Sequence, residues 1–220
     1  MKNISKVLLA FTFIALFSCN QKTTYEDIEG FDYGNIKENT YINKFFNIEM
    51  AIPDKWVVQN TDEMKELMKF SKEKSGKNNK ELDKIFKVAE ITTANLLMVF
   101  RNAPGTTTSF NPNFVLSAEN LQNNSIRTAK EYITQAKKTL ESISEGKTSI
   151  TQPDYKIRIN GIDFDSLILK KTINNMAIEQ TMLCTVKKDF AIIFIYSYDS
   201  ADQKAEIEKR VVNTIAPYKA

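Results

Sequence analysis

The chain has 220 residues, of which 42% are hydrophobic and 26% are charged, a balance typical of a folded domain rather than a disordered chain. It contains no histidine, which excludes mechanisms that need an imidazole base, proton shuttle or metal ligand. The 30 basic and 27 acidic residues give a formal charge of +3, which falls to +1 when Lys2 and Lys6 leave with the segment described next, so no nucleic-acid partner is expected.

Residues 1–18 have the layout of a secretory signal peptide. A short basic start precedes an apolar run over residues 7–17, and a basic start before a short apolar run is the usual form of such a leader. The run is too short to cross the roughly 30 Å hydrocarbon core of a bilayer as a helix. We therefore expect this segment to direct export and to be removed.

The apolar run ends in a cysteine motif, Leu16-Phe17-Ser18-Cys19. Here the sequence resembles the bacterial lipoproteins: Leu16, Ser18 and Cys19 match the lipobox, and Phe17 is bulkier than usual at its tolerant middle position. The resemblance implies cleavage before Cys19 and attachment of diacylglycerol and a further acyl chain, such as palmitate, to that residue. Several acyl chains anchor a protein stably, so a membrane is the first expected partner.

The residues after the cysteine suggest where the anchor leads. Asn20 stands where enterobacterial lipoproteins retained in the inner membrane carry Asp, so resemblance to their sorting rules favours the outer membrane, on its periplasmic or its surface face. Residues 19–39 are expected to be a lipidated, flexible tether with a reach of about 65 Å. A single domain is expected over residues 40–220.

The domain is predicted to begin with two strands. Apolar residues alternate over residues 46–52, which is the pattern of a strand with one buried face. A turn at residues 53–55 leads to a second strand that begins at Trp56. We expect Trp56 to be a core anchor rather than a ligand platform.

Two helices are predicted next. Asn60 and Glu63 have the spacing of a capping box, and apolar residues then recur at helical spacing as far as Ala89, with a polar interruption at residues 75–79. Acidic and basic residues nearly balance between residues 62 and 90. This indicates a solvated face, because a helix lying on a lipid surface would carry a basic excess.

A long loop at residues 101–113 follows a predicted strand at residues 95–100. Loops of this length are often functional, and this one offers Arg101, Phe110 and, at its end, Phe114 as a candidate interaction surface. The alternative is that the two phenylalanines fold down as the loop's own small core.

The second half of the chain is predicted to form a strand at residues 113–121, a helix at residues 128–143, and then a meander. Turn signals at Asn160-Gly161, residues 174–175 and residues 188–189 divide the stretch 155–198 into four strands.

The last strand of the meander is apolar on both faces, so it should be central and covered on both sides. Ser200 and Gln203 are predicted to cap the start of a final helix that ends at Pro217.

Isolated polar residues offer little chemistry. Asp163 and Asp165 share a strand face where a cation such as Ca²⁺ could bind, but a solvated face is the simpler reading. Glu119 and Glu131 form a conceivable hydrolase pair of a kind that any chain rich in acids offers. Cys184, the one cysteine left after lipidation, is expected in the core of a strand and has no base to activate it.

The order of elements predicts an α+β fold, an α/β/α sandwich with a central, mainly antiparallel sheet flanked by helices. Residues 45–56, the Asn160-Gly161 hairpin and the apolar strand before the last helix resemble PsbP, an extrinsic photosystem II protein whose fold recurs in bacterial lipoproteins. The resemblance covers roughly residues 40–220, implies this fold and transfers no chemistry.

We therefore expect a membrane-anchored envelope lipoprotein that acts as a non-catalytic binding or accessory module, with a protein partner in the envelope. No catalytic residues, metal site or cofactor are expected. The alternatives are a carboxylate-dependent hydrolase that works without histidine, and a carrier for a small molecule or ion with a pocket between sheet and helices. An apolar cavity of several hundred Å³ would favour the carrier.

Overall fold

The computed structural model describes residue 25 and residues 28–76, 80–107, 109–144, 148–173 and 175–219. The predicted signal peptide, residues 1–18, and the predicted lipid attachment at Cys19 lie outside the described residues. No helix in the described ranges combines the length and the apolar character needed to cross a bilayer.

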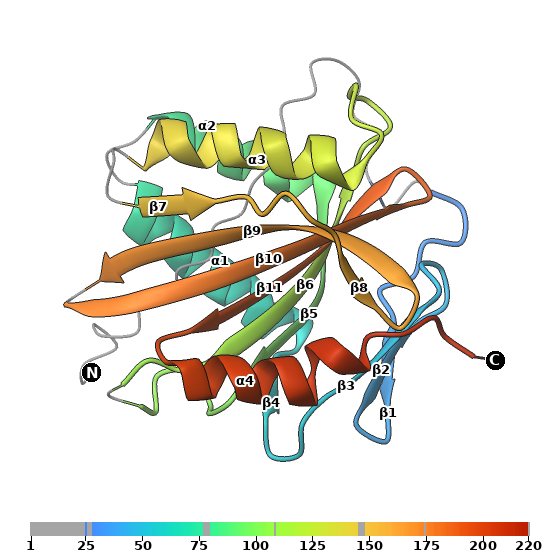
Figure 1. Ribbon diagram of the computed structural model, residues 1–220, viewed down its shortest axis with the longest axis horizontal. Coiled ribbons are helices and arrows are strands. Elements are labelled where there is room, and N and C mark those ends of the chain that lie inside the picture. The colour runs from blue at the N-terminus through green and yellow to red at the C-terminus, as the bar shows by residue number, and fades with distance from the viewer. Residues whose placement is uncertain are drawn as a thin grey trace.

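The centre of the protein is an eight-stranded antiparallel sheet. Seven strands lie in the order β4-β5-β6-β11-β10-β9-β7, and β8 pairs with the first part of the long strand β9 (Figure 1). Every residue of β11 is buried, which confirms the prediction of a central strand covered on both faces. The strands are β4 (Val57–Val58), β5 (Thr93–Phe100), β6 (Asn113–Asn120), β7 (Thr148–Thr151), β8 (Ile157–Ile159), β9 (Ile162–Ile173), β10 (Met176–Lys187) and β11 (Phe190–Tyr198).

Helices cover both faces of this sheet, so the fold is an α+β sandwich as predicted. Figure 1 shows α2 and α3 along one side of the strands and α4 along the other. Ile193 packs in the core under α3, whereas Ile192 and Phe194 pack in the core under α4, because successive strand residues point to opposite faces. The helices are α1 (Thr61–Gly76), α2 (Lys80–Thr92), α3 (Ala129–Ile143), α4 (Ala201–Arg210) and the short 3₁₀ helix η3 (Val212–Thr214).

A small three-stranded antiparallel sheet packs on the same face of the main sheet as α4. It consists of β1 (Asn35–Lys37), β2 (Thr40–Asn43) and β3 (Ile48–Ala51) in that order. The predicted buried face of the first strand is confirmed, since Phe46, Ile48, Met50 and Ile52 are all buried. Glu49 of β3 also pairs with Ala216, which fixes the C-terminal segment against this sheet.

The local signals for helices and turns are also confirmed. The Asn60 side chain accepts the Glu63 N–H at 3.0 Å while Glu63 accepts the Asn60 N–H at 2.8 Å, which closes the predicted capping box. Asn160 and Gly161 both have positive φ, at 44° and 86°, as a type I′ hairpin turn requires.

Two predicted boundaries were wrong. The expected tether of residues 19–39 extends too far, because residues 35–37 form β1 and Phe31 packs on the core; the domain begins before residue 40. The last helix was expected to reach Pro217 but ends at Arg210 and continues as η3, since the β-branched pair Val211-Val212 disfavours a regular helix.

Candidate ligand-binding cleft

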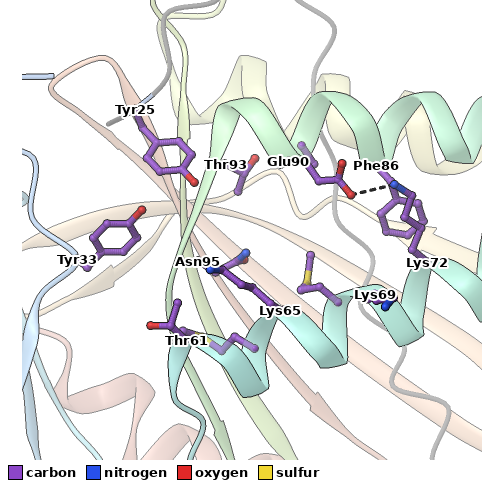
Figure 2. Close-up of a pocket in the computed structure, with 13 residues that line it drawn as sticks. Tyr25, Tyr33, Thr61, Lys65, Lys69, Lys72, Phe86, Glu90, Thr93 and Asn95 are labelled. Carbon is purple, nitrogen blue, oxygen red and sulfur yellow. Dashed lines mark hydrogen bonds and ion pairs between the residues drawn. The ribbon is translucent and has the colours of Figure 1, made fainter. Parts of the chain in front are cut away.

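A cleft of about 420 Å³ opens between α1, α2 and the start of β5, and we call it the α1–α2 cleft. Figure 2 shows Tyr25 and Tyr33 at one end and Phe86 and Lys72 toward the other, with Thr93 between them. The cleft is lined by Tyr25, Tyr33, Thr61, Met64, Lys65, Met68, Lys69, Lys72, Phe86, Ala89, Glu90, Thr93 and Asn95.

The floor of the cleft depends on an irregularity in β5. The pairing of β5 with β6 shifts between Asn95 and Leu97, so one residue is inserted there. Without that bulge, strict alternation would turn Thr93 and Asn95 to the opposite face from Met98. The bulge places all three side chains on the α1–α2 face, and bulges commonly re-aim side chains beside functional sites.

Two polar atoms on this floor are buried without a hydrogen-bond partner. Among the described residues four buried side-chain atoms lack one, and two of these, Thr93 Oγ1 and Asn95 Oδ1, belong to residues that line the cleft. Thr93 is only 6% exposed. A buried hydroxyl without a partner costs about 1–3 kcal/mol, so such groups require an explanation, and a ligand would supply one.

The walls of the cleft are apolar. Met64 and Met68 stand one turn apart on α1, and Phe86 and Ala89 face them from α2, because both helices present their apolar stripe to the sheet. Methionine side chains are flexible and adapt to differently shaped partners. Apolar walls with a few placed polar groups are the usual form of a small-molecule site.

Charges on the rim of the cleft are segregated. Lys65, Lys69 and Lys72 recur at the i, i+4 and i+7 spacing of one helix face. Lys72 pairs with Glu90 across the two helices at 2.8 Å. Lys65 and Lys69 have no carboxylate within ion-pair distance in the part of the chain that the structure describes. The lining therefore carries three lysines against one glutamate, a formal charge of +2.

Tyr25 and Tyr33 form one end of the cleft, and the backbone at Tyr33 is held by Tyr41 of β2. The Tyr41 hydroxyl donates to the Tyr33 carbonyl at 2.7 Å, and burial raises the pKa of Tyr41 well above its ordinary value. Gly34, at φ +81°, lies against the Tyr41 ring, where any Cβ would be 2.5 Å from a ring atom. The rings of Tyr25 and Tyr33 meet edge to face at 6.2 Å, which seats Tyr25 on the cleft.

The two phenylalanines of the loop proposed from the sequence are buried. Phe110 and Phe114 are 7% and 0% exposed, so both fold down, but Phe114 packs in the main core under α4 and not in a small core of the loop's own. Asn111 closes the loop by accepting the Asn102 N–H and donating to its carbonyl. Arg101 stays exposed and pairs with Glu206 of α4 at 3.4 Å.

The two glutamates considered as a hydrolase pair serve separate structural roles. Glu131 closes the capping box of α3 with Thr128, and its pKa is lowered by the backbone N–H groups that it accepts. Glu119 lies fully buried under α3 and accepts the Tyr132 hydroxyl at 2.7 Å. Burial first, and Glu119 second, raise the pKa of Tyr132 well above its usual range. Glu119 and Glu131 therefore do not form an acid–base pair.

The remaining candidates are also occupied structurally. Asp163 forms a two-pronged ion pair with Arg158, at 2.7 and 3.1 Å, which lowers the pKa of its carboxyl group. Within the described ranges no cluster of three or more Cys, Asp or Glu is placed to hold a metal ion. Cys184 is buried in β10, where burial and then Asp165 raise the thiol pKa. Trp56 is buried, as expected of a core anchor.

Comparison with known proteins finds only distant structural likenesses and assigns no function. No protein-family model and no curated protein sequence matches the chain. Among solved structures it is similar to CyanoP, the PsbP of Synechocystis sp. PCC 6803, with 12% identity and a TM-score of 0.48 over 81% of this chain and 91% of that one. It is also similar to LpqN, involved in cell envelope biogenesis of Mycobacterium tuberculosis, with 10% identity and a TM-score of 0.39 over 76% and 78% of the two chains.

A further similar structure comes from Bacteroides thetaiotaomicron, with 10% identity and a TM-score of 0.41 over 84% of this chain and 50% of that one. Likenesses of this degree concern the arrangement of helices and strands. They carry no activity, ligand or partner to this chain.

Proposed function

We propose that the chain is a lipid-anchored protein of the bacterial cell envelope that acts by binding, and that the α1–α2 cleft is its site for a small amphipathic molecule. The observation that carries the proposal is the pair of unpartnered polar atoms, Thr93 Oγ1 and Asn95 Oδ1, on residues that line a cleft with apolar walls. A ligand with polar groups at one end and apolar surface elsewhere complements both features.

Two other functions are less well supported. A protein-contact module would be expected to expose a broad apolar patch, but only four large apolar side chains are exposed among the described residues: Tyr33, Ile36, Ile91 and Tyr155. A hydrolase needs a free acid–base pair, and the carboxylate that lines the cleft, Glu90, is paired with Lys72. In this proposal an envelope protein partner is not the object of the binding module but delivers the ligand to the cleft or receives it from there.

The binding proposal is tested by recovering the ligand. Mature protein is captured from the cells that make it and analysed by native mass spectrometry for a small molecule bound in stoichiometric amount. Met68→Trp, which fills the cleft, should abolish the bound mass, whereas Lys209→Trp on exposed α4 should retain it. Equal loss or equal retention in both variants would contradict the proposal.

The anchor is tested separately with Cys19→Ala. The variant should leave the membrane fraction and should no longer be cleaved before residue 19, since the processing enzyme acts on lipidated cysteine. Continued membrane fractionation with processing at the same bond would overturn the lipoprotein assignment.

A further inference from the structure

The charge on the rim of the cleft indicates the sign of the ligand's charge. Lys72 is neutralised by Glu90 at 2.8 Å, whereas Lys65 and Lys69 are exposed and have no carboxylate partner within the described residues. An anionic group bound there would gain charge-assisted hydrogen bonds from side chains that are already present. A neutral ligand would gain no charge-assisted bond from these two lysines, and a cationic ligand would be repelled by the +2 charge of the lining.

The volume of the cleft limits the apolar part. A cavity of about 150 Å³ holds one benzene ring, which has six carbons, so the same packing places roughly seventeen carbons in the cleft. The volume of about 420 Å³ is therefore filled by the head group and part of one acyl chain, and leaves no room for the second chain of a bilayer phospholipid.

The floor specifies the polar head. Asn95 Oδ1 can only accept, so its partner must donate a hydrogen bond, whereas the Thr93 hydroxyl can donate to an anionic oxygen. A bare carboxylate has no donor for Asn95. A head that carries both an anion and a hydroxyl group satisfies the two atoms at once.

The position of the cleft along the chain suggests the source of the ligand. Tyr25 lines the cleft, and Cys19 precedes it by only six residues. Six residues span at most about 20 Å, far less than the reach expected of a tether to residue 39. A protein lipidated at Cys19 therefore carries the mouth of the cleft close to the membrane surface.

We infer that the α1–α2 cleft takes a single-chain anionic lipid with a hydroxylated head, of the chemical class of lysophosphatidylglycerol, from the membrane that holds the anchor. The acyl chain lies between Met64, Met68 and Phe86, and the head group reaches Lys65, Thr93 and Asn95. The inference deepens the proposed function and rests on it.

The test uses lipidated protein in phosphatidylcholine vesicles with four photoreactive probes that carry the same diazirine-tagged chain. The probes are lysophosphatidylglycerol, the uncharged monoacylglycerol, the hydroxyl-free fatty acid and two-chain phosphatidylglycerol. Labelled residues are identified by mass spectrometry. Lysophosphatidylglycerol should label residues of α1 and α2 in the cleft at least about fivefold more than each of the other probes.

Paired variants isolate the charge. Lys65→Gln with Lys69→Gln should lower lysophosphatidylglycerol labelling about fivefold to tenfold and leave monoacylglycerol labelling unchanged. Lys55→Gln with Lys209→Gln makes the same change in net charge away from the cleft and should alter neither by more than about twofold.

The outcomes separate the two levels of the claim. If monoacylglycerol or the two-chain lipid labels the cleft as strongly as lysophosphatidylglycerol, or the lysine variants change nothing, this inference is overturned and the binding proposal stands. If no probe labels the cleft and Met68→Trp carries the same bound mass as the unmodified protein, the proposed function fails as well.

Discussion

Replacing Thr93 by Val should stabilise the ligand-free protein and weaken ligand binding. Valine has nearly the same shape as threonine and favours strands, so the substitution removes the hydroxyl from β5 without opening a cavity. In the free protein that hydroxyl is buried without a partner among the described residues. In the proposed complex the hydroxyl donates a hydrogen bond to the ligand, so its removal should weaken ligand binding.

The magnitudes follow from the burial of the group. Desolvating an unpartnered hydroxyl costs about 1–3 kcal/mol, so Thr93→Val should raise the free energy of unfolding by about 1–2 kcal/mol. For a domain of this size that corresponds to a Tm increase of about 2–8 °C. A lost hydrogen bond to an anionic ligand, about 1.5–3 kcal/mol, should weaken binding tenfold or more.

The assay is urea unfolding of the lipidated protein in nanodiscs, followed through the single tryptophan, Trp56, which is buried. Binding of lysophosphatidylglycerol is measured on the same samples. Ser166→Ala is the matched control, because Ser166 Oγ is also buried and unpartnered in the described structure but lies in β9, outside the cleft. It should stabilise the protein and leave binding unchanged. The reasoning is refuted if Thr93→Val destabilises the protein, or if it leaves binding intact.

Three further perturbations test the scaffold. Gly34→Ala should destabilise the protein by about 2–4 kcal/mol in urea unfolding, since a left-handed φ alone costs about 1–2 kcal/mol and the new Cβ meets the Tyr41 ring. Tyr132→Phe should cost about 1–3 kcal/mol in the same assay, because buried Glu119 loses a 2.7 Å hydrogen bond. Burial lowers the pKa of Lys171 to about 8, so the folded state binds fewer protons than the unfolded state above pH 8, and the free energy of unfolding should rise with pH from about 8 to 10.

Each of these has an internal control. Gly30 also has positive φ, at 73°, but open space around its Cβ position, so Gly30→Ala should cost only the backbone part. An equal effect at Gly30 and Gly34 would contradict the contact with Tyr41. Lys171→Met should flatten the rise with pH, and an unchanged slope would show that another group titrates. A change below about 0.5 kcal/mol for Tyr132→Phe would show that Glu119 does not depend on the phenol.

The sequence predicted the fold well where local chemistry decides the structure. Capping at Asn60 and Thr128, positive φ in the Asn160 hairpin and the apolar run of β11 each depend on residues within one element. The strand β7 was missed, since Thr148–Thr151 is short and lies at the edge of the sheet, where it needs no apolar pattern.

The cleft was foreseen only as a general alternative, a pocket between sheet and helices. The near balance of charge between residues 62 and 90 hid the separation of Lys65, Lys69 and Lys72 onto one face of α1, although their helical spacing could have indicated it. The bulge after Asn95 depends on pairing with β6 and has no signature in β5 itself.

The most direct measurement of the central claim is methyl NMR of the lipidated protein in nanodiscs, with ¹³C-labelled methionine methyl groups. Met64 and Met68 line the cleft, whereas Met50 and Met182 are buried in other parts of the core. Adding lysophosphatidylglycerol should shift the Met64 and Met68 signals in a saturable manner and leave those of Met50 and Met182 in place. Unchanged Met64 and Met68 signals at saturating lipid would contradict the assignment of the cleft as the binding site.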